Sequence, residues 1–140
     1  MLEIVIESTR IRIGPDAVPY DSYYFGFSDG PESSVELVLR RVLAQWADAV
    51  ERLSNTESTV YLPFSLDDQW VEAFRARLTV HQVSLRCVRL AENGYMVNVD
   101  DLKDFMQEAH RIEHEEPKDF GSYARTDFVA ALRNVQIDAA

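Results

Sequence analysis

The chain has few of the residues that mark several common protein classes. It holds one cysteine, five glycines and five prolines among 140 residues. A single cysteine excludes an internal disulfide, which is compatible with a reducing compartment. Cys87 lies in an apolar stretch, and we interpret it as a small buried hydrophobic residue. The apolar runs are only a few residues long, whereas a membrane-spanning helix requires roughly 20. We therefore expect no membrane helix.

The few glycines form neither a Walker pattern nor a dinucleotide-binding pattern. A glycine-rich phosphate loop therefore has no support in the sequence. We expect no cofactor.

Basic residues are also scarce relative to acidic ones. Fourteen Lys and Arg stand against 24 Asp and Glu, so the formal net charge is −10. A field of this sign repels nucleic acid and anionic lipid, and it attracts a basic partner. Negative charge that simply keeps the protein soluble is an equally good explanation. The acidic start of the chain lacks the basic region of a secretory signal, so we expect a cytoplasmic protein.

The composition is that of a globular protein, with 46% hydrophobic and 27% charged residues. This length suits one domain, and we assign residues 1–140 to a single α+β domain. The predicted fold is one antiparallel sheet of five or six strands. Two main helices and a short C-terminal helix are expected to cover one face of that sheet.

Apolar residues alternate with polar ones in several short stretches, as in half-buried strands. Residues 2–13 are expected to form a long bulged strand or a tight hairpin. The other expected strands are residues 23–27, 60–64, 69–79, 83–90 and 95–97. Residues 66–78 also have helical propensity. We favour a strand there because it would pair with residues 83–90 as a hairpin around His81 and Gln82.

Apolar residues three and four apart predict helices over residues 33–54 and 101–116, and a short helix over 126–135. A capping box formed by Ser33 and Glu36 would begin the first helix. Asp100 or Asp101 would cap the second, and Pro117 would end it.

One pattern matches a known metal motif. His110, Glu113 and His114 have the H-x-x-E-H spacing of inverted zinc peptidases, in which the two histidines share a helix face. Such enzymes need a third ligand far downstream, but only 26 residues follow His114. A solvated helix end is the simpler interpretation.

Two acidic clusters are the other candidates for function. Asp67 and Asp68 form one, and Asp100, Asp101 and Asp104 form the other. Paired carboxylates act as general acids and bases only when folding brings them together in a cleft. Both clusters also stand where helix caps and turns favour acidic residues. A negatively charged docking patch is the functional alternative, and no residue is predicted to be catalytic.

Four short motifs carry a resemblance to a protein family. They are Leu62-Pro63-Phe64, Asp67-Asp68-Gln69-Trp70, Phe74-Arg75 and Glu92-Asn93-Gly94-Tyr95. With them, residues 58–102 resemble a group of small bacterial proteins, some of which are immunity proteins that neutralise polymorphic or contact-dependent toxins. The resemblance implies a strand over residues 69–79 and a non-catalytic protein that binds one partner protein.

These observations predict a protein-binding module rather than an enzyme, with an immunity protein against a basic toxin as its most concrete form. The predicted contact residues are Asp67, Asp68, Trp70, Glu72, Asp100, Asp101 and Asp104. Two alternatives remain open. One is a small metal-dependent hydrolase that uses His110, Glu113 and His114. The other is a structural subunit in which Tyr23, Tyr24 and Phe25 form a homodimer contact, so the protein is expected to be a monomer or a homodimer.

Overall fold

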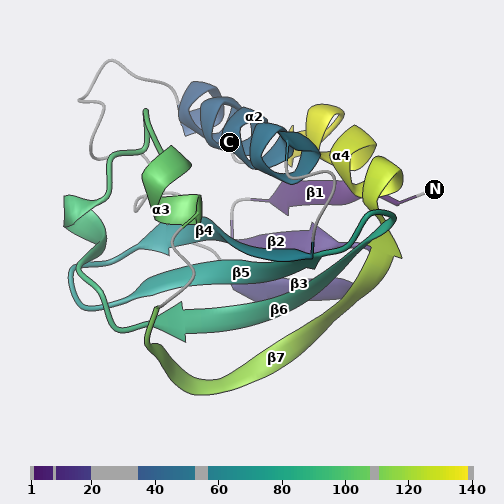
Figure 1. Cartoon of the computed structure of the whole chain (residues 1–140). Coiled ribbons are helices and arrows are strands. Elements are labelled where there is room, and N and C mark those ends of the chain that lie inside the picture. Colours follow the sequence, from purple (N-terminus) through teal and green to yellow (C-terminus); the bar gives the residue numbers. More distant parts are fainter. Residues whose placement is uncertain (1, 8, 20–34, 53–56, 108–110, 139–140) are drawn as a thin grey trace.

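The structure is a computed structural model that describes residues 2–7, 9–19, 35–52, 57–107 and 111–138 (Figure 1). The predicted strand over residues 23–27, the Ser33 cap and the aromatic group Tyr23, Tyr24 and Phe25 lie outside the described residues. The described part contains no helix that is both long and apolar enough to cross a membrane.

The first sheet joins the two ends of the described chain. It contains β1 (Ile4–Glu7), β2 (Arg10–Ile13), β3 (Asp16–Pro19) and β8 (Gln136–Asp138), in the order β3-β2-β1-β8. β1 pairs with β2 as an antiparallel hairpin and with β8 in parallel. The hairpin form of residues 2–13 is therefore confirmed, whereas β3 and β8 were not expected.

The second sheet is antiparallel and follows the order of the chain. It contains β4 (Ser58–Leu66), β5 (Val71–Leu78), β6 (Gln82–Leu90) and β7 (Glu113–Ala124). The strand interpretation of residues 69–79 is confirmed by β5, which pairs with both β4 and β6.

The prediction of a single sheet of five or six strands is wrong, because the described strands form two sheets of four. Alternating apolar residues show that a segment is a strand, but they do not show which strand it pairs with. The N-terminal strands pair with the distant β8 rather than with β4, and no local pattern specifies that choice.

Proline occurs in three strands that lie at sheet edges. Pro19 ends β3, Pro63 lies in β4 and Pro117 lies in β7. Proline has no backbone N–H to donate to a neighbouring strand, so it is tolerated at an edge and blocks further pairing there. Pro117 thus belongs to an edge strand and does not end a helix.

The described helices are α2 (Val35–Arg52), α3 (Lys103–Gln107) and α4 (Arg125–Arg133). Within the described residues, α2 confirms the helix predicted over 33–54, and α4 confirms the short helix predicted over 126–135. The helix predicted over 101–116 is wrong, because α3 has only five residues and β7 begins at Glu113. The predicted strand over residues 95–97 is also wrong, since Gly94–Met96 forms a 3₁₀ turn.

The error in the helix predicted over 101–116 has a physical cause. The apolar stripe that predicted the helix 101–116 ends at Ile112, whose side chain is 76% exposed. Beyond it, Glu113 and His114 pair with Leu90 and Arg89 of β6. The pairing of these residues with β6 thus overrides a local helical pattern.

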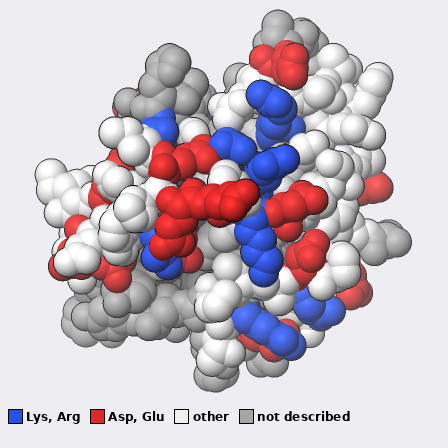
Figure 2. All heavy atoms as spheres, turned by 90° about the horizontal axis from the view of Figure 1, so that it is seen from below, with Lys and Arg blue, Asp and Glu red and all other residues white. Residues whose placement is uncertain are grey.

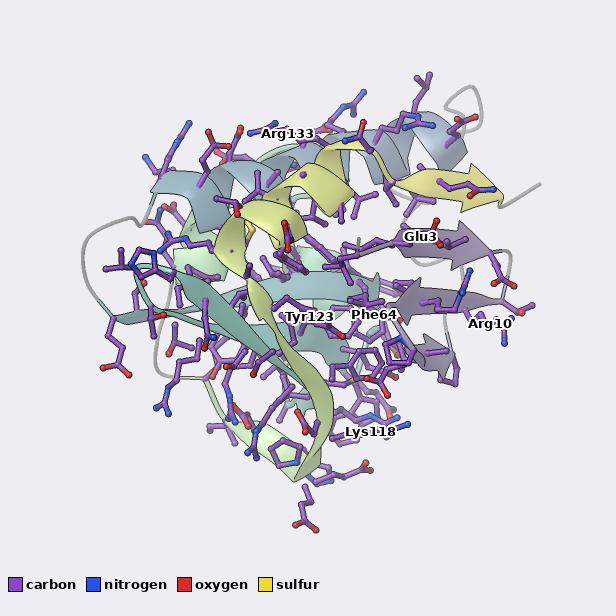
Figure 3. All side chains as sticks on the ribbon, turned by 90° about the vertical axis from the view of Figure 1, so that its right-hand side faces the viewer. Glu3, Arg10, Phe64, Lys118, Tyr123 and Arg133 are labelled. Carbon is purple, nitrogen blue, oxygen red and sulfur yellow. The ribbon has the colours of Figure 1, made fainter. Side chains whose placement is uncertain are left out.

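Helices α2 and α4 lie side by side above the sheets (Figure 1). Trp46 of α2 lies in the core, since its side chain is 1% exposed and its ring contacts Phe74 edge-on, with the ring centres 5.9 Å apart. Phe74 also contacts Phe64 at 4.8 Å and Phe120 at 5.0 Å. Phe64 lies between the two sheets (Figure 3).

Arg125 is a buried polar residue of this core. Its guanidinium donates hydrogen bonds to the carbonyl oxygens of Val50 at the end of α2 and of Thr79 after β5. Burial lowers the pKa of Arg125. One side chain thus holds α4, α2 and the β5–β6 turn together.

Candidate functional site

One end of the second sheet gathers both acidic clusters. β4 ends and β6 ends there, and β5 and β7 begin there, at the left in Figure 1. The β4–β5 turn holds one cluster, and α3, which contacts β4, adjoins the other. We call this region the acidic end and define it by six residues: Asp67, Asp68, Glu92, Asp100, Asp101 and Asp104.

Gly94 is the residue that allows these two segments to meet. Its backbone N–H donates to the Asp67 carbonyl oxygen at 2.6 Å. A Cβ atom at position 94 would lie 2.4 Å from the Leu66 carbonyl carbon, closer than real side chains allow. The described glycines with positive φ are Gly14 and Gly121. Gly94 is therefore required for close approach and not for its backbone conformation.

The first cluster forms the β4–β5 turn. A carboxylate oxygen of Asp67 accepts a hydrogen bond from the Gln69 backbone N–H at 3.2 Å, which fixes the turn. A hydrogen bond with the Asp67 carboxyl, followed by desolvation and repulsion from the same group, raises the pKa of Asp68. The two carboxyl groups therefore interact directly.

The second cluster is fastened to α2. Asp100 forms an ion pair with Arg41 at 2.5 Å. The Gln45 side chain accepts a hydrogen bond from the Leu102 N–H at 2.7 Å and donates one to the Val99 carbonyl oxygen at 2.8 Å. Sequence reasoning missed Gln45, because its partners lie more than 50 positions away.

A hollow of about 470 Å³ lies between the 3₁₀ turn and α3, and Asp101, Asp104 and Met96 line it. Arg111 also lines the hollow, where it forms an ion pair with Glu92 and places its guanidinium 3.8 Å from the centre of the Phe105 ring. Arg111 thus anchors the chain before β7.

Trp70 and Glu72 lie beside this region, and both have partners within the chain. The Trp70 ring packs on the His114 ring at 4.7 Å, and the Arg89 guanidinium lies 5.8 Å from the Trp70 ring centre. Arg89 also forms ion pairs with Glu72 at 3.3 Å and with Glu115 at 3.2 Å. These charges are therefore largely balanced.

The seven predicted contact residues thus divide into two groups. Asp100 and Glu72 form ion pairs, Asp67 fixes a turn, and Trp70 packs on His114. Within the described ranges, no Lys or Arg nitrogen lies within 4.0 Å of the carboxylates of Asp68, Asp101 or Asp104.

Three exposed apolar side chains at the acidic end were missed by sequence reasoning. Met96 is 82% exposed, Ile112 is 76% exposed and Tyr95 is 50% exposed. The Ile112 carbonyl oxygen accepts a hydrogen bond from the Ala91 N–H at 3.2 Å, which places Ile112 beside the same loop. No local pattern indicates this exposure, because Met96 falls in the predicted strand 95–97 and Ile112 falls on the apolar stripe of the predicted helix 101–116.

The helical geometry expected for the H-x-x-E-H pattern is wrong. His110 lies outside the described residues, and Glu113 and His114 are neighbours in β7 rather than members of one helix face. Glu113 accepts hydrogen bonds from Tyr61 and Arg75, while His114 packs on Trp70. In the part of the chain that the structure describes, no group of three or more His, Cys, Asp or Glu side chains is arranged to hold a metal ion.

The polar face of the second sheet carries a further cluster, which sequence reasoning did not assemble. The Glu113 carboxylate accepts a hydrogen bond from the Tyr61 hydroxyl at 3.0 Å and from Arg75 at 2.6 Å through both of its oxygens. Burial, and then the hydrogen bond and charge of Glu113, raise the pKa of Tyr61 to about 12.

Tyr61 and Arg75 also line a groove of about 750 Å³ on this face, which we call the arginine groove. It is lined by polar side chains from all four strands: Thr59, Tyr61, Arg75, Arg77, Ser84, Arg86, Asp119 and Ser122. Figure 2, which views the molecule from below, shows Lys and Arg side chains in a row with acidic side chains on both sides.

The other side of β6 carries the cysteine. Cys87 is half-buried and packs against the core, which agrees with its interpretation as a small hydrophobic residue. Burial, with a smaller contribution from Glu72, raises the pKa of its thiol to about 11. A thiol held protonated in this way is a poor nucleophile at neutral pH.

Comparisons with known proteins identify no relative, since no family model, no curated protein and no solved structure matches the chain.

Proposed function

We propose that the protein is a non-catalytic binding module that recognises a basic protein partner through its acidic end. The observation that supports this proposal is the combination of exposed apolar side chains with carboxylates that form no ion pair in the described structure. Met96 lines the same hollow as Asp101 and Asp104, with Tyr95 next to it in the 3₁₀ turn.

This combination matches the anatomy of protein interfaces. Aromatic residues and Met are enriched at the centre of such interfaces, and the surrounding rim is polar. Carboxylates that are not neutralised within the chain attract a basic surface and accelerate its association, an effect that salt screens. The net charge of −10 adds to this attraction.

The immunity-like resemblance over residues 58–102 gives the proposal its concrete form. That segment contains β4, β5, β6, the 3₁₀ turn and most of the acidic end. In this form, the module blocks a basic toxin by occupying its surface. The predicted contacts are then Met96, Tyr95, Asp68, Asp101 and Asp104.

A pull-down from the native cell tests the proposal, with the tagged chain as bait. We expect one basic protein to be retained at low salt and released as salt rises. The double variant Asp101→Asn/Asp104→Asn should lose the retained protein. The control Asp48→Asn/Glu51→Gln removes two carboxylates from α2, which pair with Arg133 away from the acidic end, and it should keep the partner.

Equal loss in both double variants would show that only total charge matters and would contradict a defined interface. A second measurement tests the immunity form. The retained protein should inhibit growth when it is expressed alone, and co-expression with the wild-type chain should restore growth. If the partner does not inhibit growth, the immunity form is wrong, but the proposal of a binding module stands.

A further inference from the structure

The arginine groove contains positive charge that the described part of the chain does not balance. Arg75 is paired with Glu113, and nearby Arg89 is paired with Glu72 and Glu115. Arg77 and Arg86 differ from them. Among the described residues, no carboxylate oxygen lies within 4.0 Å of either guanidinium, and neither side chain donates a hydrogen bond.

The register of the sheet brings these two side chains to one place. Arg77 of β5 lies opposite Ser84 of β6, and Arg86 lies opposite Arg75. Arg77 and Arg86 are therefore diagonal neighbours on one face, with backbones about 7–8 Å apart. At that separation two long arginine side chains can reach the same anion.

Arg77 and Arg86 carry positive charge that no ion pair within the described structure neutralises. Like charges directly opposite each other on a sheet face are destabilising, and Arg75 and Arg86 form such a pair. In a chain with a net charge of −10, clustered arginines that lack partners indicate a role in recognition rather than in solubility.

We propose that the arginine groove binds a small hydroxyl-rich molecule through its phosphate group. Two guanidiniums without carboxylate partners match the double charge of a phosphate monoester, and guanidinium binds phosphate oxygens through paired hydrogen bonds. Apart from Leu85, the rest of the lining is polar. The Thr59, Ser84 and Ser122 hydroxyls and the Asp119 carboxylate offer hydrogen bonds to the hydroxyls of such a molecule.

Size and charge both favour a small ligand over an extended polyanion. The groove volume of about 750 Å³ lies within the range of small-molecule sites. Glu113 lies beside Arg75, and Asp119 lies opposite Arg86 in the register. These two carboxylates bracket the arginines and repel a chain of phosphates that extends beyond the groove. This proposal is independent of the acidic end.

Calorimetric titration of the full chain with glucose 6-phosphate at low ionic strength tests the proposal. We expect saturable binding of glucose 6-phosphate, weaker binding of inorganic phosphate and no binding of glucose. The variants Arg77→Gln and Arg86→Gln should each weaken the binding by about tenfold to a hundredfold, the effect of losing a charged hydrogen bond. The control Arg10→Gln removes an exposed arginine that pairs with Glu7 on the first sheet and should leave the binding unchanged.

Thermal unfolding separates recognition from a structural role. Glucose 6-phosphate should raise the unfolding midpoint of the wild type but not of the Arg77→Gln/Arg86→Gln double variant. Without ligand, the double variant should unfold at the same temperature as the wild type or above it.

Three results would overturn the proposal. They are no saturable binding of glucose 6-phosphate, equal binding by the double variant, and tighter binding of a phosphoserine peptide than of glucose 6-phosphate. The last result would assign the groove to a phosphorylated protein instead.

Discussion

The acidic end and the arginine groove belong to the same four-stranded sheet and carry opposite unbalanced charges. At the acidic end, Asp68, Asp101 and Asp104 form no ion pair in the described structure, and Asp101 and Asp104 line one hollow with exposed Met96. In the groove, Arg77 and Arg86 form no ion pair in the described structure and lie among hydroxyl groups. An apolar centre suits a protein surface, whereas a polar concavity suits a small hydrophilic anion.

Between the two regions, the charges are paired. Glu113, at the start of β7, holds Arg75 and Tyr61, and Arg89 holds Glu72 and Glu115. These ion pairs separate the unpaired carboxylates of the acidic end from the unpaired arginines of the groove.

The largest expected effect is on the packing of the acidic end. Gly94→Ala should destabilise the protein by about 3 kcal/mol, because the new Cβ atom overlaps the Leu66 backbone and forces the 3₁₀ turn away from β4. Urea unfolding measures this change. Met96→Ala in the same turn is the control, and it should stay within about 0.5 kcal/mol of the wild type because its side chain is exposed. A Gly94→Ala variant as stable as this control would show that the close approach is not required.

The next effect concerns the paired charges between the two regions. Glu113→Ala should destabilise the protein by about 2 kcal/mol, since it leaves partly buried Arg75 and the hydroxyl of buried Tyr61 without their acceptor. Glu115→Ala on the same strand, whose exposed carboxylate pairs with Arg89, should cost less than about 0.5 kcal/mol. Equal losses in urea unfolding would mean that Glu113 has no special structural role.

Alkaline titration tests the interaction between Glu113 and Tyr61 separately. Tyr61 should ionise with a pKa of about 12 in the folded protein, against an ordinary value of 10.0. Because the folded pKa is raised, protonated Tyr61 contributes to the free energy of unfolding. This contribution is present in full below pH 10 and is lost as pH rises toward 12. Phenolate absorbance follows the ionisation, and Tyr61→Phe identifies the signal. The pKa should fall in Glu113→Gln, which removes the negative charge, and an unchanged pKa would assign the shift to burial alone.

The smallest expected effect is close to zero. Arg86→Gln should not destabilise the unliganded protein, because the repulsion from Arg75 that it removes offsets the attraction to Asp119 on the other side of the strand. Arg10→Gln, which breaks the exposed pair with Glu7, should instead cost up to about 0.5 kcal/mol. Urea unfolding of both variants under the same conditions gives the comparison. A marked loss of stability in Arg86→Gln would show that the groove arginines serve the fold.

Local sequence patterns correctly predicted the long helix and two of the hairpins. The helix predicted from the apolar stripe of α2 was correct, and so were the hairpin at the start of the chain and the β5–β6 hairpin. Side-chain periodicity lies within each segment, so the sequence of the segment alone indicates which of its faces is buried.

Prediction failed where distant segments compete for the same backbone. Residues 113–116 extend β7 at the sheet edge rather than α3, and β8 joins β1 across most of the chain length. The acidic end depends on the same kind of contact. Its two clusters were read as separate patches, and only the hydrogen bond from Gly94 to Asp67 and the contact of α3 with β4 place them together.

The sequence by itself determined the α+β class, the long helix, the strands of the β5–β6 hairpin and the negative net charge. Only the tertiary structure decided that there are two sheets, that Met96 stands exposed beside Asp101 and Asp104, and that Arg77 and Arg86 share a groove. The reason is physical. Local alternation fixes which way a side chain points, whereas strand register and long-range hydrogen bonds fix which distant side chains it meets.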